Sequence, residues 1–160
     1  MAEPSTDRPH VPGYGIPETL DGVLPWSWAL ERLERALIYW LATAGSDGAP
    51  HVIPIWGAWV DGRWYVEGGP TRWQRNLRQN PQLAIHIEIG NEVVIAEGSV
   101  VELVAPGPPL ADAILAGYAK YQPGYAADAA NWAEGGLWEL RPVKAFGWSI
   151  FPADMTRFRF

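Results

Sequence analysis

The sequence predicts a mainly β protein, an antiparallel barrel that is closed or partly closed and carries a few helices. Asp61-Gly62 separates two strand-like runs, and this dipeptide is a strong signal for a two-residue hairpin turn. Residues 83–89 alternate strictly between apolar and other side chains, as a half-buried strand does. Strand-like segments follow one another in long antiparallel pairs instead of alternating with helices, which favours a barrel over a doubly wound sheet.

Residues 1–22 are rich in proline and glycine and predict an N-terminal arm, lying on the surface or on a partner subunit. Residues 23–160 are expected to form a single domain. Helices are predicted over residues 26–37, 72–79 and 108–121. Six to eight strands are expected, drawn from residues 37–44, 51–60, 63–67, 83–89, 93–103, 137–140, 145–150 and 156–160.

Composition excludes several classes of function. The 160 residues are 48% hydrophobic, which suits one soluble domain with a packed core, and the net charge of −6 argues against nucleic-acid binding. The chain has no cysteine, so disulfides, thiolate nucleophiles and Cys-ligated metals are excluded. No apolar stretch approaches the roughly 18 residues of a membrane span, and the proline-rich start lacks signal-peptide features, so a cytoplasmic protein with no membrane partner is expected.

The residues 72–78 concentrate positive charge at the predicted start of a helix. Thr71 is a good N-cap after the turn Gly68-Gly69-Pro70, and the first N–H groups of a helix attract anions. Arg72 and Arg75 are spaced to share a helix face and close over such an anion. The alternative is a solvated basic face with Thr71 as a routine cap. The window therefore predicts a phosphate site, subject to its context in the fold.

The order and the amino-acid sequence of several segments resemble the FMN-binding split-barrel superfamily. This superfamily includes pyridoxamine 5′-phosphate oxidase-like proteins and flavin- or deazaflavin-dependent oxidoreductases. The resemblance runs from about Leu37 to Phe160. Its pieces are Trp40-Leu41-Ala42-Thr43, Asp47-Gly48-Ala49-Pro50-His51, Val52-Ile53-Pro54-Ile55-Trp56, Arg75-Asn76-Leu77-Arg78-Gln79-Asn80-Pro81, Glu97-Gly98 and Thr156-Arg157-Phe158-Arg159-Phe160. Together, in this order, they indicate an antiparallel split β-barrel.

The resemblance implies a homodimer with a cofactor groove between its subunits, and a cofactor that is FMN or, alternatively, coenzyme F-420. The flavin ring would lie along the second strand and the phosphate at the turn and helix that follow the third. Pro54 suits an edge strand or a bulge, where its missing N–H is not needed. The implied cofactor-binding residues are His51, Val52, Ile53, Pro54, Ile55, Trp56, Thr71, Arg72, Trp73, Arg75 and Asn76.

The implied activity is two-electron transfer to or from a small planar substrate. No catalytic residue is identified, because the cofactor carries the redox chemistry. The candidate proton donors are Tyr65, Tyr118, Tyr121 and His51. The ending Arg157 to Phe160 differs from the Arg-x-His substrate region of the true oxidase. Arg157 and Arg159 alternate onto one face, free to contact the cofactor or a glutamate at a dimer seam.

One departure from the superfamily pattern concerns Trp73, which stands where FMN-binding members commonly have a lysine. Arg72 or Arg75 could replace that lysine, or the tryptophan could shrink the pocket or stack on a ring. The alternative functions are a non-enzymatic binding protein for a flavin, haem or another planar ligand, and a dimer with a vestigial pocket. His51 and His86 lack the spacing of a metal site, although His86 is a secondary candidate for contact with haem or substrate.

Overall fold

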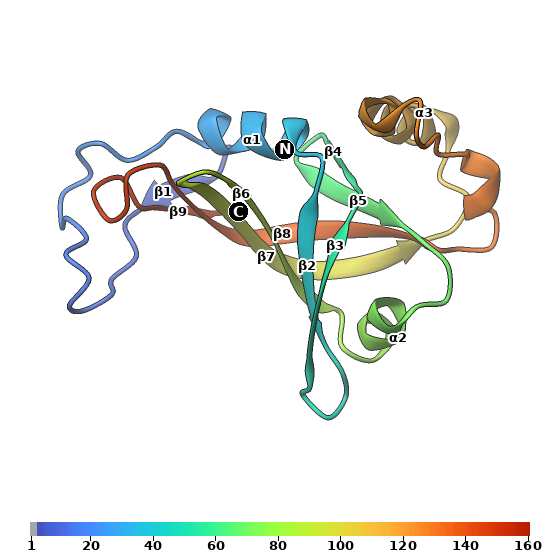
Figure 1. The fold of residues 1–160 in the computed structure, drawn as a ribbon, viewed down its shortest axis with the longest axis horizontal. Coiled ribbons are helices and arrows are strands. Elements are labelled where there is room, and N and C mark those ends of the chain that lie inside the picture. The colour runs from blue at the N-terminus through green and yellow to red at the C-terminus, as the bar shows by residue number, and fades with distance from the viewer. Residues whose placement is uncertain (1–2) are drawn as a thin grey trace.

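The computed structural model describes residues 3–160, in which one strongly curved antiparallel sheet is accompanied by three α-helices (Figure 1). The strands are β1 Ser5–Asp7, β2 Tyr39–Ala44, β3 Pro50–Ile55, β4 Ala58–Val60, β5 Arg63–Glu67, β6 Gln82–Ile89, β7 Glu92–Leu103, β8 Leu137–Trp148 and β9 Thr156–Arg159. The helices are α1 Trp26–Arg35, α2 Arg72–Gln79 and α3 Pro108–Tyr118, with short 3-10 helices η1 Ala119–Tyr121 and η2 Ala129–Trp132. Within the described residues, every helix is too short or too polar to cross a membrane.

The sheet divides at β8, because this long strand changes partners along one of its edges. Its first residues pair with β5 and its later residues pair with β9, while β7 pairs along the other edge. The main strand order is β1-β9-β8-β7-β6-β2-β3, with β5 and β4 branching from β8. Within residues 3–160 the outer edges of β3 and β4 pair with no further strand, so the barrel is split. This confirms the predicted mainly β split barrel.

The prediction of two separate strands over residues 137–140 and 145–150 is wrong, because β8 is continuous. Pro142 lies in the middle of this strand, where a proline is unusual because it has no N–H for the ladder. It lies opposite Gly98, where the pairing of β7 and β8 shifts register and a missing N–H is tolerated. A Cβ atom on Gly98 would lie 2.1 Å from the carbonyl oxygen of Arg141, so this crossing requires glycine.

The predicted single strand over residues 51–60 is interrupted after Ile55, and the chain resumes as β4 at Ala58. Gly57 occupies the break, where a Cβ atom would lie 2.4 Å from the indole nitrogen of Trp64. Because the chain turns here, β3 stays with β2 while β4 pairs with β5 across the Asp61-Gly62 hairpin. Both hairpin residues have positive φ, 49° and 76°, as the predicted two-residue turn requires.

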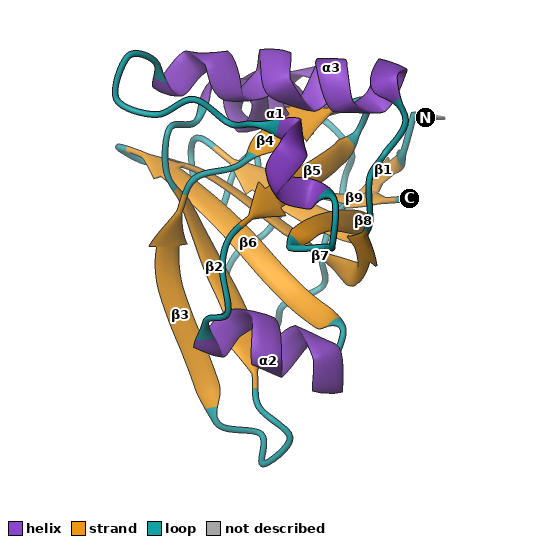
Figure 2. Cartoon of the chain, turned by 90° about the vertical axis from the view of Figure 1, so that its right-hand side faces the viewer, coloured by secondary structure: helices purple, strands orange, loops and turns teal. Residues whose placement is uncertain are grey.

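Two apolar clusters lie on opposite faces of β5. Trp64 and Val66 point into the barrel, where they join the main core, whereas Tyr65 points toward α3 and joins a second cluster. The three residues are 0 to 2% exposed, so β5 is covered on both faces. α1 and α3 lie at one end of the sheet and α2 lies at the other end, beside β2 and β3 (Figure 2).

The N-terminal arm is tied to the end of the same chain. β1 pairs with β9, and Asp7 forms ion pairs with Arg157 and Arg159. The guanidinium of Arg8 donates hydrogen bonds to four backbone carbonyls, two in the arm and two just before β9. The expectation that Arg157 and Arg159 are free for a cofactor or a dimer seam is therefore wrong, because a carboxylate of the arm binds both.

Candidate functional site

Helix α2 presents two arginines to solvent. It spans Arg72–Gln79, the predicted range, with Thr71 as its N-cap residue. Trp73, Gln74, Asn76 and Leu77 form its buried side, whereas Arg72 and Arg75 are exposed. Neither of these two arginines forms an ion pair among residues 3–160, whereas Arg78 pairs with Glu102. The Thr71 side chain makes no capping hydrogen bond, so the first-turn N–H groups receive no acceptor from it.

Two buried amides fix the position of α2. The Gln74 side chain donates a hydrogen bond of 2.7 Å to the carbonyl of Gly68, which holds the turn against the helix. The Asn76 side chain donates to the hydroxyl of Thr43 on β2 at 3.0 Å. Because Thr43 pairs with His51, the second residue of β3, α2 lies near the start of that strand. Asn76, predicted as a cofactor contact, uses its amide within the fold, and its cofactor contact stays a prediction.

The side chain of Trp73 lies in the core. It is 3% exposed, and its ring meets that of Trp138 edge to face with centroids 6.2 Å apart. The ring also packs close to Gly68, where a Cβ atom would lie 3.1 Å from it. Trp73 therefore packs in the core, and its backbone N–H is the part of the residue that remains for an anion.

β3 is an edge strand, and its side chains divide between two faces. His51, Ile53 and Ile55 are half-buried, and His51 shares the inner face with Thr43. Val52 and Pro54 are exposed on the other face. Its unpaired edge leaves backbone N–H and C=O groups available within the described structure, and Pro54 stands in an edge strand as predicted.

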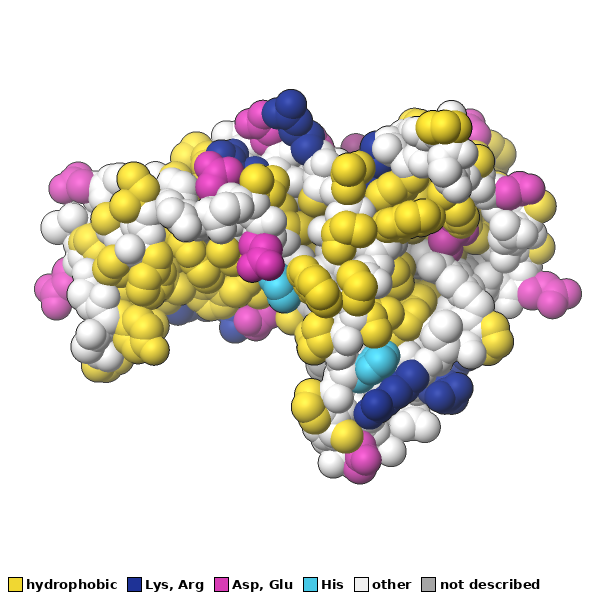
Figure 3. Space-filling view, in the orientation of Figure 1, with side chains coloured by type: hydrophobic (Ala, Val, Ile, Leu, Met, Phe, Trp, Pro, Cys, Tyr) yellow, Lys and Arg dark blue, Asp and Glu magenta, His cyan; other side chains and the backbone are white. Residues whose placement is uncertain are grey.

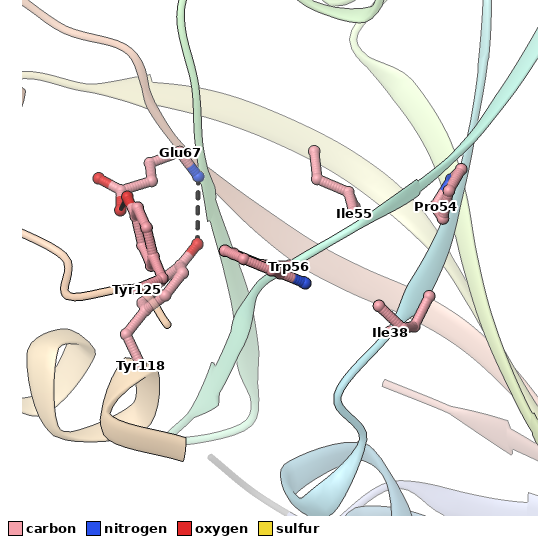
Figure 4. A pocket seen from close by; sticks show the side chains of 7 residues that line it. All are labelled: Ile38, Pro54, Ile55, Trp56, Glu67, Tyr118 and Tyr125. Atoms are coloured by element: carbon pink, nitrogen blue, oxygen red, sulfur yellow. Dashed lines mark hydrogen bonds between the residues drawn. The ribbon is translucent and has the colours of Figure 1, made fainter. Parts of the chain in front are cut away.

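A cavity of about 400 Å³ opens beside the end of β3 (Figure 4). It is lined by Ile38, Pro54, Ile55, Trp56, Glu67, Tyr118 and Tyr125. A second cavity of about 350 Å³ shares Glu67 and Tyr125 and extends to the Gly68-Gly69 turn. The two form a continuous groove from Trp56 to the turn that precedes α2. Figure 3 shows hydrophobic side chains over the middle of this face and basic side chains below them, where α2 lies.

Aromatic residues from the segment after β7 shape this groove. The Trp56 ring stacks on Tyr121 at 5.1 Å with an interplanar angle of 20°, and lies 5.3 Å from the ring of Tyr125. The Tyr121 hydroxyl donates to the carbonyl of Gly57 and accepts from its N–H, so the 3-10 helix is fastened to the β3–β4 break. Trp56 is 42% exposed and forms one wall of the opening.

Glu67, at the end of β5, is the charged group of the groove. Its carboxylate accepts hydrogen bonds from the hydroxyl of Tyr125 and from the indole N–H of Trp132. Its backbone N–H donates to the Tyr118 hydroxyl at 3.2 Å. Glu67 was not predicted from the sequence as a site residue. The available signal was a lone acidic residue closing a buried strand directly before Gly68-Gly69.

The three tyrosines considered as proton donors each donate a hydrogen bond within the fold. Burial raises the pKa of Tyr121 to about 12 and is the main cause that raises the pKa of Tyr65 and of Tyr118. The Tyr65 hydroxyl donates to Glu139, and the Tyr118 hydroxyl donates to the carbonyl of Tyr65. These phenols stay protonated and are weak acids near neutral pH. The structure thus offers structural roles for all three.

These features define an antiparallel split β-barrel with an open groove that runs from the end of its edge strand to the turn before a basic helix. A family model described as pyridoxamine 5′-phosphate oxidase matches residues 29–149, and the chain belongs to this family. A search of the curated proteins finds no significant match.

Solved structures support the same fold. A structure described as an F420 reductase is 24% identical, with a TM-score of 0.57 over 72% of this chain and 93% of that one. An FAD-binding protein from Mesorhizobium loti is 18% identical, with a TM-score of 0.61 over 86% and 95%. A heme binding protein from Mycobacterium smegmatis is 18% identical, with a TM-score of 0.60 over 81% and 57%. At these identities the likeness establishes the fold alone.

Proposed function

We propose that this chain is a homodimeric oxidoreductase that binds FMN or coenzyme F-420 in the groove between β3 and α2 and acts on a small planar substrate. The observation that carries the proposal is the start of α2, where uncapped N–H groups and the exposed Arg72 and Arg75 meet. This arrangement suits a phosphate. Family membership and neighbours described as an F420 reductase and an FAD-binding protein support a flavin-type cofactor.

The residues present fit such a cofactor. Thr71, Arg72, Arg75 and the backbone N–H of Trp73 would hold its phosphate, and the free edge of β3 would hold its ring by backbone hydrogen bonds and by apolar contact. The cofactor supplies two-electron transfer when bound. The protein's own contribution is to orient the ring on a rigid strand and to exclude water from the aromatic groove.

A row of half-exposed side chains supports the homodimer. Trp40, His86, Ile95 and Phe146 follow one another across β2, β6, β7 and β8 on the face opposite the core. The rings of Trp40 and His86 stack at 6.3 Å. An apolar row of this kind is typical of a subunit interface. Sedimentation of the protein should give twice the mass of one chain, and substitution of Trp40 by arginine should shift it toward the monomer.

The second candidate is a non-enzymatic binding protein for haem or another planar ligand. The aromatic walls of the groove and a neighbour described as a heme binding protein favour it. One experiment separates the two candidates: the purified protein is titrated with FMN, coenzyme F-420 and haem, and absorbance and tryptophan fluorescence are followed. Saturable binding of FMN or F-420 is expected. Binding of haem alone would favour the second candidate, and binding of none would refute the oxidoreductase proposal and haem as the ligand of the second candidate.

A further inference from the structure

Glu67 differs from the other glutamates that the fold partly buries. Glu92, Glu102 and Glu139 each form an ion pair with at least one arginine. Glu67 forms none among the residues that the structure describes, and its two carboxylate oxygens accept from the neutral donors Tyr125 and Trp132. These donors orient the carboxylate without supplying a positive charge. Glu67 lines both cavities, so its formal negative charge lies beside the groove with no cation paired to it among the described residues.

The walls around this carboxylate suit a flat organic cation. Figure 4 shows Glu67, Tyr118 and Tyr125 together at one end of the cavity, Ile38 and Pro54 at the other, and Trp56 between them. Aromatic faces attract cations, most strongly where water is excluded. Because Trp56 is stacked on Tyr121 and Glu67 is held by two donors, both recognition elements are preorganised. The volume of about 400 Å³ suits a small one- or two-ring molecule.

Opposite charges flank the Gly68-Gly69 turn. Arg72 and Arg75 are exposed at the start of α2, whereas Glu67 lies on the far side of the Gly68-Gly69 turn, where both cavities meet. An anionic group is therefore favoured at α2 and disfavoured at Glu67. A cationic group has the opposite preference.

We propose that the cavity at Glu67 binds the planar cationic head of the substrate, an amidine-like or protonated aminoheteroaromatic group. Its N–H groups donate to the Glu67 carboxylate, and its ring lies against Trp56 and Tyr125. The inference names a substrate class for the proposed function and rests on that function only in treating the ligand as a substrate. The binding itself requires no cofactor.

The test compares naphthamidine, which is planar and cationic, with naphthamide, its neutral isostere. Isothermal titration of the full chain should show that the amidine binds at least about tenfold more tightly than the amide, the effect of one charge-assisted hydrogen bond. Glu67→Gln should reduce this ratio to about one to two, whereas Glu134→Gln should leave it unchanged. Glu134 is an exposed glutamate two residues beyond Trp132 and controls for a general loss of negative charge.

Equal binding of amide and amidine by the wild-type protein, or no binding of either, would overturn the inference, and this comparison does not depend on how any variant folds. Trp56→Leu provides a second check: it should weaken both probes, and the amidine more than the amide, because the attraction of the aromatic face for the cation is lost as well. In indole N–H spectra, the amidine should shift the signals of Trp56 and Trp132 and leave that of Trp138 in place. Shifts confined to other indoles would also contradict the proposal.

Repeating the titration with FMN or F-420 present separates this inference from the proposed function. A chain that prefers the amidine but binds neither cofactor refutes the oxidoreductase proposal and retains the cation site. A chain that binds a cofactor without preferring the amidine refutes the cation site and retains the oxidoreductase proposal.

Discussion

Asp7 and Arg157 lie 150 positions apart and form a bidentate ion pair that joins the two ends of the chain. Arg157 donates from Nε to Oδ1 of Asp7 at 2.7 Å and from Nη2 to Oδ2 at 2.8 Å. The hydrogen bond from Arg157 is the main cause that lowers the pKa of Asp7 below its ordinary value of 3.8. The pair thus fastens the N-terminal arm to β9, beyond the pairing of β1 with that strand.

Replacement of this carboxylate should cause a small, pH-dependent loss of stability. The Asp7 side chain is 40% exposed, so Asp7→Asn should lower the free energy of unfolding by about 0.5–1 kcal/mol near neutral pH. Because the folded pKa is the lower one, the contribution is present above the unfolded pKa and disappears as the pH falls through the folded pKa. Wild type and variant should therefore converge in acid, as measured by urea unfolding at several pH values. Glu18→Gln, an exposed change in the arm, serves as the control, and a difference that persists in acid would contradict the assignment.

The turn between β3 and β4 should tolerate no side chain larger than a hydrogen atom. A Cβ atom at Gly57 would lie 2.4 Å from Nε1 of Trp64, a fully buried residue. Gly57→Ala should therefore lower the free energy of unfolding by about 2–4 kcal/mol, through displacement of the indole or of the backbone. Gly69→Ala is the matched control, since no atom lies within 4 Å of its Cβ position. Equal stability of the two variants in thermal unfolding would show that the contact is not limiting.

Trp73→Lys tests whether this position is a lost phosphate contact. The ring of Trp73 is buried against Trp138, so lysine should leave a cavity and place an ammonium in the core. We expect a loss of about 3–5 kcal/mol of unfolding free energy and no gain in flavin binding. Trp73→Phe, which keeps the site apolar, should be distinctly milder. A stable lysine variant with improved FMN affinity would instead restore the interpretation of Trp73 as a substitute for the lysine.

Arg72 and Arg75 should each contribute to cofactor affinity and little to stability. Both are exposed and form no ion pair among residues 3–160. Arg72→Ala or Arg75→Ala should weaken binding of FMN or F-420 by about tenfold, with a smaller effect at high salt. Arg35→Ala on α1 removes another exposed arginine, one that pairs with Glu31, and should not change affinity. Unchanged affinity in all three variants, measured by fluorescence titration, would exclude α2 as the phosphate site.

Much of the fold follows from local patterns. The Asp61-Gly62 turn, the alternation of β6 and the extent of α2 are set by neighbouring residues, and the structure confirms each. The elements that differ depend on distant contacts. β8 continues through Pro142 because Gly98 lies opposite it, and the strand expected over residues 51–60 breaks because Trp64 occupies the space beside Gly57.

The candidate site divides in the same way. The basic helix, the turn before it and the edge position of Pro54 were predicted from the sequence, because propensity and charge spacing are local properties. The burial of Trp73, the partners of Arg157 and the cavity at Glu67 were not. Glu67 meets Tyr125 and Trp132, which follow it by 58 and 65 residues. Short-range sequence patterns do not predict contacts between residues so far apart in the chain.

The sequence by itself therefore determined a mainly β barrel and an anion-attracting helix start, since period-two alternation, turn residues and charge spacing are each carried by a few adjacent residues. The tertiary structure alone decided which side chains face the groove. The set of side chains that face the groove depends on which strand pairs with β8 at each point along its length. It also depends on how α3 and the segment after it pack over β5. These long-range contacts place an acidic aromatic cavity before the Gly68-Gly69 turn, and the exposed arginines of α2 follow that turn.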